Sequence, residues 1–203
     1  MEDNNTVDNY IYINSNKIRY RILGEGDSIV MLIHGIGGYI EGWAGTSALI
    51  SKYQKVVVLD LVGHGLSDKP DISYSIDMFT EFIVSFMKQM NIENAVLVGH
   101  SLGGAICLNL AVKYPHKVNS LVLVNSAGVK IPFGIRLGSL GILKRVNIKT
   151  SRFMVKMFSR NSIYDKKFIN KDWIDQAYKF INIDGSYRVM FSIIRSNINL
   201  LGL

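Results

Sequence analysis

Cysteine, acidic residues and long apolar stretches are all scarce in this chain of 203 residues. The single cysteine, Cys107, excludes an intrachain disulfide bond and is expected to be a small buried apolar residue. No apolar stretch reaches the roughly 18 residues of a membrane-spanning helix. Residues 1–8 are acidic and polar and lack the basic and apolar regions of a secretory signal. We therefore expect a cytoplasmic protein without a membrane span.

Basic residues outnumber acidic residues: the chain has 23 Lys and Arg and 16 Asp and Glu, which gives a net charge of +7. The basic residues are scattered, although denser after Lys130, and they form no run of five and no stripe interleaved with aromatic residues. This distribution favours a solvated basic face over a nucleic-acid site. G-x-G-x-x-G after a strand and G-x-x-x-x-G-K-[ST] are both missing, which argues against dinucleotide and phosphate-cradling sites. No cofactor and no metal are expected.

Strand-like and helix-like segments alternate over residues 1–129, which we interpret as one core. Short β-rich runs at Tyr10–Asn14 and Lys17–Leu23 predict a hairpin or two neighbouring strands. Residues 75–90 predict an amphipathic helix capped by Ser75, and residues 41–52 a helix with Trp43, Leu49 and Ile50 inward. Buried strands are predicted at 28–33, 55–61, 95–98 and 118–124. The alternation predicts an α/β fold: a mostly parallel sheet with helices on both faces.

Residues 130–203 have a different pattern, which predicts a separate helical layer. Gly134, Gly138 and Gly141 interrupt a basic, apolar linker, and helix-like pieces follow near 151–159, 171–180 and 186–197. The Met and Phe residues of this layer either line an apolar pocket or pack within the layer itself; they are Phe133, Phe153, Met154, Met157, Phe158, Met190 and Phe191.

The stretch Asn94–Gly104 places a serine at the apex of a strand–turn–helix unit. A short apolar run is followed by Gly99-His100-Ser101-Leu102-Gly103-Gly104 and then by a helix-like segment. A serine on so sharp a turn has strained backbone angles, and side chains at Gly99 and Gly103 would collide. The Leu102 N–H lies at a helix N-terminus, where negative charge is favoured. The pattern predicts a nucleophile; the alternative is a glycine-rich turn with a capping serine.

These motifs together resemble the α/β-hydrolase superfamily, in particular the group with a helical cap after the sixth strand. The resemblance implies an oxyanion hole made by the backbone N–H groups of Ile36 and Leu102. It also implies that His34, Gly35, Gly37, Gly99, His100 and Gly103 support this loop and the serine turn. Asp60, Gly63, His64, Gly65 and Ser67 match a family loop that is structural rather than catalytic.

The resemblance implies a catalytic acid and a histidine after the nucleophile, and neither is identified here. His34, His64 and His100 match loop positions, and His116 follows the helix after the serine. Asn125 stands where some members carry an alternative acid, but an amide cannot serve as one. We expect the sequence to be an incomplete chain that ends within the cap. Residues 118–124 would then form a sheet edge where Leu121, Val122, Leu123 and Val124 promote self-association.

Several functions stay open. The first is a serine hydrolase that acts on a small apolar ester or similar acyl substrate through a Ser101 acyl-enzyme and is inactive without its acid and histidine. An acyltransferase or a C–C bond hydrolase of the same fold is compatible with the same serine. The alternative from another class is a non-catalytic protein that binds a small apolar ligand in the capped pocket.

Overall fold

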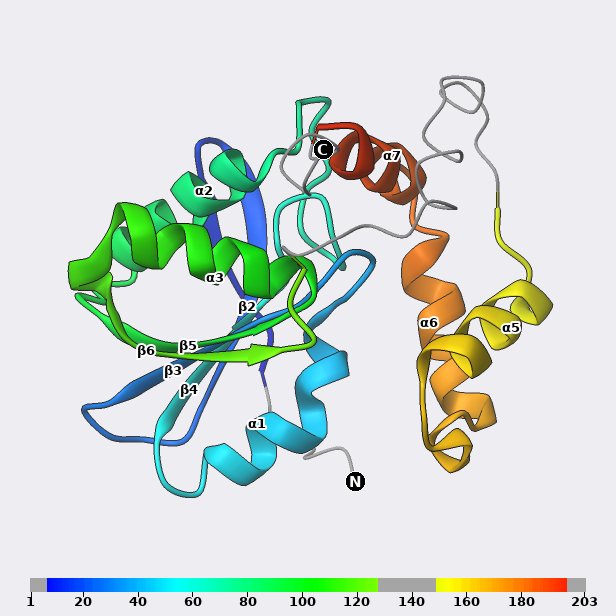
Figure 1. Cartoon of the computed structure of the whole chain (residues 1–203), viewed down its shortest axis with the longest axis horizontal. Coiled ribbons are helices and arrows are strands. Elements are labelled where there is room, and N and C mark those ends of the chain that lie inside the picture. Colours follow the sequence, from blue (N-terminus) through cyan, green and yellow to red (C-terminus); the bar gives the residue numbers. More distant parts are fainter. Residues whose placement is uncertain (1–6, 128–148, 197–203) are drawn as a thin grey trace.

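The computed structural model describes residues 7–127 and 149–196, and its centre is a six-stranded sheet (Figure 1). The strand order is β1-β2-β4-β3-β5-β6. β1 and β2 form an antiparallel hairpin, β2 also pairs antiparallel with β4, and the remaining neighbours are parallel. The predicted α/β fold with a mostly parallel sheet is confirmed. The strands are β1 (Asn9–Ile13), β2 (Asn16–Leu23), β3 (Ile29–Ile33), β4 (Lys55–Leu59), β5 (Ala95–His100) and β6 (Val118–Val124).

Helices cover both faces of the sheet because alternate strand side chains point to opposite faces. α2 (Ile76–Gln89) and α3 (Leu102–Lys113) lie on one face, and the 3-10 turn η1 (Ile40–Trp43) and α1 (Ala44–Ile50) lie on the other (Figure 1). α2 is capped as predicted, since the Ser75 hydroxyl accepts a hydrogen bond from Met78 N at 3.1 Å. The short 3-10 turn η2 (Pro115–Lys117) ends α3 and leads into β6.

The helices after residue 149 lie beyond the end of the sheet and reach back to it. They are α5 (Arg152–Ser162), the 3-10 turn η3 (Lys166–Phe168), α6 (Lys171–Ile181) and α7 (Ser186–Ser196). Phe180 stacks on Tyr39 with ring centroids 4.0 Å apart, and Val189 and Ile193 join the main core. The three helices predicted from the sequence are therefore present. The expected boundary at residue 130, the linker glycines and Phe133 lie outside the described residues.

Two expectations about burial are wrong. Leu49 is exposed rather than inward, because the segment begins with a 3-10 turn, which shifts the inward face to Ile40, Trp43 and Ser47. Residues 118–124 form the predicted strand, but it is not buried on both faces; it lies at the edge of the sheet, which agrees with the expected sheet edge. β6 pairs with β5 alone among the described strands, and Val122 is 47% exposed.

Candidate active site

Ser101 lies at the turn between β5 and α3 with φ 52° and ψ −116°. These angles are unfavourable for a residue with a side chain, and surrounding hydrogen bonds hold them. The Ser101 N–H donates to Val124 O at 3.1 Å, and its carbonyl accepts from Gly104 N and Ala127 N at 3.0 and 2.9 Å. The strained turn predicted from the sequence is present, and the end of β6 and the residues after it keep it in place.

Gly99 and Gly103 flank this turn where no side chain fits. A Cβ on Gly99 would lie 2.5 Å from Gly103 O, and a Cβ on Gly103 would lie 2.2 Å from Ile33 O and 2.7 Å from His34 O. These neighbours are backbone atoms, which cannot turn aside as a flexible side chain can. The two glycines let β5, the start of α3 and the end of β3 approach one another closely.

The loop after β3 lies directly against Ser101. Gly35 O accepts a hydrogen bond from Gly38 N at 3.0 Å, and Gly37 has φ 71°, which together describe a type II turn with Ile36 at its second position. A Cβ on Gly35 would lie 2.9 Å from the Ser101 Cβ. Register explains the meeting, because Ile33 pairs with Gly99 and both strands end at the same edge of the sheet.

The two backbone groups predicted to form an oxyanion hole come from these two turns. Leu102 is the first residue of α3, whose N-terminal N–H groups have no partner within the helix. The Ile36 side chain is exposed, so this residue is not part of the hydrophobic core. The Leu102 side chain is buried in the main core, whereas the Ile36 side chain could change without affecting its backbone donor. The assignment of both N–H groups as donors stays a prediction.

His34 is a buried, neutral structural group. Its Nε2 accepts a hydrogen bond from Leu61 N at 3.1 Å, so Nδ1 carries the proton and donates to Gly35 O at 2.8 Å. Burial lowers the pKa of His34 to about 4. The His64 ring lies 5.1 Å from the His34 ring, and burial lowers its pKa as well. The imidazole of His34 therefore ties the Gly35 loop to the segment after β4.

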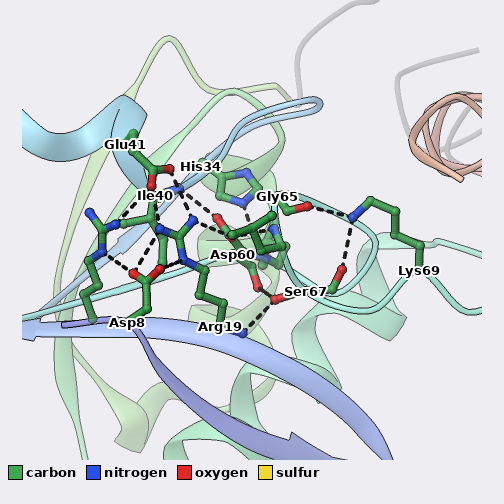
Figure 2. Close-up of polar contacts among 12 residues, drawn as sticks. Asp8, Arg19, His34, Ile40, Glu41, Asp60, Gly65, Ser67 and Lys69 are labelled. Atoms are coloured by element: carbon green, nitrogen blue, oxygen red, sulfur yellow. Dashed lines mark hydrogen bonds and ion pairs between the residues drawn. The ribbon is translucent and has the colours of Figure 1, made fainter. Parts of the chain in front are cut away.

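Asp60, completely buried after β4, joins the loops on the same side of the site (Figure 2). Its carboxylate accepts from Ile40 N and Leu66 N at 2.8 Å each and pairs with Arg19 at 3.3 Å. Burial raises the pKa of Asp60 to about 6, against the opposite effect of these donors. Arg19 of β2 is only 2% exposed and also pairs with Asp8 and Glu41.

Sequence reasoning placed Asp60 in a structural loop and missed the buried arginine that faces it. The remaining contacts of that loop fit a structural role: the Ser67 hydroxyl donates to Asp60 O at 2.8 Å, and Lys69 Nζ donates to Gly65 O at 2.7 Å (Figure 2). Arg19 stands between Ile18 and Tyr20 of β2, and its burial requires the carboxylate partners that surround it.

A hollow lies between these loops and the later helices. Its sheet side is lined by Gly37, Gly38, Gly63, His64 and Gly65, and its other side by Phe180, Ile181, Ser186, Tyr187 and Met190. Of the seven Met and Phe residues predicted for a pocket, Met190 lines this hollow, whereas Phe153, Met154, Met157 and Phe158 are exposed to solvent.

No histidine of the chain is hydrogen-bonded to Ser101, and all four lie within the described residues. His116 follows the far end of α3, a helix about 18 Å long by its residue count. Asn125 has φ 45° directly after β6. Within the described ranges, no three His, Cys, Asp or Glu side chains lie together in a group that could hold a metal ion.

The fold and the strained serine turn define a class of protein, and a comparison with known families points to the same class. The family model described as "alpha/beta hydrolase fold" matches residues 28–146, which include both turns of the site. The chain belongs to the alpha/beta hydrolase family. Within the described residues, no helix has the length and apolar character needed to cross a membrane.

Relatives within this family have different reactions in their names. The chain is 38% identical over 107 residues to 2-hydroxymuconate semialdehyde hydrolase of Pseudomonas sp. (strain CF600), covering 51% of this chain and 38% of that protein. It is 30% identical over 168 residues to the dihydrolipoyllysine-residue acetyltransferase component of the acetoin cleaving system of Pseudomonas putida, covering 82% and 44%. The chain thus spans less than half the length of either relative.

A solved structure with the same fold is also similar to this chain. A meta-cleavage product hydrolase from Pseudomonas fluorescens IP01 superposes with a TM-score of 0.75 at 26% identity, covering 91% of this chain and 66% of that chain.

Proposed function

We propose that the protein is a serine hydrolase in which Ser101 attacks an acyl carbonyl. The observation that carries the proposal is the backbone of Ser101, with φ 52° and ψ −116° between Gly99 and Gly103. A non-catalytic protein that binds a small ligand would not need this strained backbone, because an unstrained turn would connect β5 to α3 equally well.

In the proposed reaction, Ser101 Oγ forms a bond to the substrate carbonyl carbon while its proton passes to a base. The negative charge that develops on the carbonyl oxygen is stabilised by the N–H groups of Leu102 and Ile36, and by the N-terminus of α3. The bond to the leaving group then breaks, the leaving group takes the proton, and water releases the acyl group from Ser101.

The base of this reaction is not among the four histidines. His34 uses both ring nitrogens in structural hydrogen bonds, and His64 is fully buried beside it. His116 is at the wrong end of α3, and His100 forms no hydrogen bond with Ser101. We infer that the base comes from outside these 203 residues. The isolated chain should therefore turn over less than about a thousandth as fast as an active enzyme, because binding and an oxyanion hole alone give little rate.

The hollow has a partly apolar lining, although its volume of about 20 Å³ is too small to hold a substrate as it stands. Phe180, Ile181 and Met190 supply apolar surface, and Gly37 and Gly38 bring the predicted oxyanion loop to its wall. An ester or similar acyl compound is our first candidate. Hydrolysis of a C–C bond next to a carbonyl is the second, because relatives named 2-hydroxymuconate semialdehyde hydrolase and 2-hydroxy-6-oxo-2,4-heptadienoate hydrolase match this chain.

Two substrates and two variants test the proposal in a form of the protein that also contains the catalytic base. Turnover of p-nitrophenyl acetate and of 2-hydroxy-6-oxo-2,4-heptadienoate is compared for the unaltered protein, Ser101→Ala and Ser126→Ala. Ser126 is the matched control, because its hydroxyl donates to Ala127 O close to the same turn. Ser101→Ala should lower kcat by roughly 10⁴–10⁶ on whichever substrate is used. Full turnover by Ser101→Ala would refute the proposal, and the preferred substrate decides between the two reactions.

A further inference from the structure

A groove with a volume of about 560 Å³ lies between α5 and α6, and the proposed reaction does not use it. The two helices lie side by side (Figure 1), and Arg152 Nε of α5 donates to Asp175 Oδ1 of α6 at 2.5 Å. No residue lines both this groove and the hollow beside the predicted oxyanion loop. Sites for small molecules have volumes of roughly 300–1,000 Å³, so the groove has room for such a ligand.

Three basic side chains line the groove, and they give it an excess of positive charge. Arg152 and Lys156 are four residues apart on α5, so they lie on the same side of that helix. Lys171 is the first residue of α6. Within the described ranges, Lys156 and Lys171 form no hydrogen bond and no ion pair. Asp175 is the one carboxylate in the lining, which therefore favours an anion.

Arg152 is held in an orientation that leaves its terminal amino groups available. Its Nε bonds to Asp175, and its guanidinium carbon lies 4.1 Å from the centre of the Tyr178 ring. Among the residues that the structure describes, neither Nη1 nor Nη2 has a hydrogen-bond partner. Two N–H groups of a guanidinium can bind a carboxylate or a phosphate together. Because this side chain is already held on two sides, it loses little freedom when an anion binds.

The groove also has an apolar part. Ile169 and Ile174 line it, and both are half-buried. Asn170, between them in the chain, is used to cap α6, since its Oδ1 accepts a hydrogen bond from Trp173 N at 2.8 Å. A ligand that is only a charged group would leave the isoleucine surface in water, whereas an apolar chain would cover it. The lining therefore favours a ligand with one anionic end and one apolar end.

We propose that the α5–α6 groove binds an amphiphilic anion, a small molecule with a carboxylate or phosphate at one end and a short apolar chain at the other. The anionic end binds to Arg152, Lys156 and Lys171, and the chain lies on the two isoleucines. An acidic peptide fits less well, because the volume is that of a small molecule and Asp175 repels a series of carboxylates.

This site is separate from the proposed catalytic serine, so the test needs no turnover. Titration calorimetry on the 203-residue chain compares octanoate and octyl phosphate with octanol, acetate and inorganic phosphate. We expect an octyl anion to bind, and the better of the two identifies the charged end. Octanol should not bind, and acetate and phosphate should bind at least about tenfold more weakly, because they bury no chain. Raising the salt from about 0.1 M to about 0.5 M should weaken the binding.

Matched variants separate the groove from general positive charge. Lys156→Gln with Lys171→Gln should lower the affinity for the octyl anion about tenfold or more, because two charged donors are lost. Arg152→Lys keeps the charge but should also weaken binding, because the paired N–H groups are lost. Lys52→Gln with Lys88→Gln removes the same charge from exposed positions elsewhere and should leave the affinity unchanged. The four lysines are exposed, so thermal unfolding midpoints should not change.

Chemical labelling of lysine amines, located by mass spectrometry, reports on the groove directly. A saturating octyl anion should slow the labelling of Lys156 and Lys171 and not that of Lys52 and Lys88. Four results would each overturn the proposal: no binding of either octyl anion, equal binding of octanol or acetate, an unchanged affinity in Lys156→Gln with Lys171→Gln, or no protection of the two groove lysines.

Discussion

Acid should destabilise this fold through His34, and the size of the effect follows from its burial. The pKa of His34 is lowered to about 4, from about 6.5 in an unfolded chain. Between these values the unfolded chain binds a proton that the folded chain does not bind. Stability is therefore complete above about pH 6.5 and is lost as the pH falls toward 4.

The magnitude can be worked out from the two pKa values. At pH 5 the unfolded state gains about 2 kcal/mol relative to the folded state, and below pH 4 the difference approaches about 3.4 kcal/mol. The measurement is urea unfolding of the chain and of His34→Gln at pH 8 and pH 5. A glutamine oxygen can still accept from Leu61 N, and it does not titrate.

We expect the unaltered chain to lose about 2 kcal/mol more than His34→Gln between pH 8 and pH 5. His64 adds a pH dependence of its own, which becomes smaller in His34→Gln, because the neighbouring His34, as the second cause after burial, also lowers the pKa of His64. His116→Gln, at an exposed position after α3, is the control and should keep the full loss. Equal slopes for His34→Gln and the unaltered chain would refute the reasoning.

Three further changes test the turns and the sheet edge. Gly103→Ala should destabilise the chain by about 1–3 kcal/mol in urea unfolding, because its Cβ meets backbone atoms, whereas Gly45→Ala on α1 meets nothing within 4 Å and should be neutral or stabilising. Ile36→Pro fits the second position of a type II turn but removes an N–H, so the active enzyme should fold and lose roughly 2.7–4 kcal/mol of transition-state stabilisation, whereas Ile36→Val should lose little kcat. Leu123→Lys, at the exposed edge of the sheet, should reduce any self-association seen by size-exclusion chromatography without lowering stability; an unchanged dimer would show another interface.

The parts of the fold that depend on local rules could be predicted from the sequence. Ser75 before an amphipathic stretch indicated the start of α2, and Gly99 and Gly103 around Ser101 indicated the strained turn. Each of these features depends on residues close together in the chain, so the pattern contains the cause. The predicted facing of Leu49 was wrong, because the segment begins with a 3-10 turn that has no marker in the sequence. Trp43 and Ile50 of the same segment pack against the core as predicted.

Features built by distant segments could not be predicted in the same way. Arg19 and Asp60 are 41 residues apart, and the ion pair becomes visible when β2 is found beside β4. The composition of residues 118–124 does not predict the exposure of β6, and the sheet edge was expected from the family resemblance instead. Their apolar character is the same for an inner strand and for an edge strand.

The hollow beside the predicted oxyanion loop is formed partly by local turns, which the sequence indicates, and partly by distant helices, whose placement it does not indicate. Its sheet side is formed by glycine-rich turns that the sequence marked, and its far side by α6 and α7, whose sequences indicated helices but not their direction. The Tyr39–Phe180 stack joins the two sides, since Tyr39 follows the predicted oxyanion loop and Phe180 lines the hollow. The predicted chemistry of the site therefore depends on local backbone constraints, which are strict. A substrate of the proposed kind would also meet side chains of α6 and α7. The fold alone therefore does not decide among the reactions that the relatives are named for.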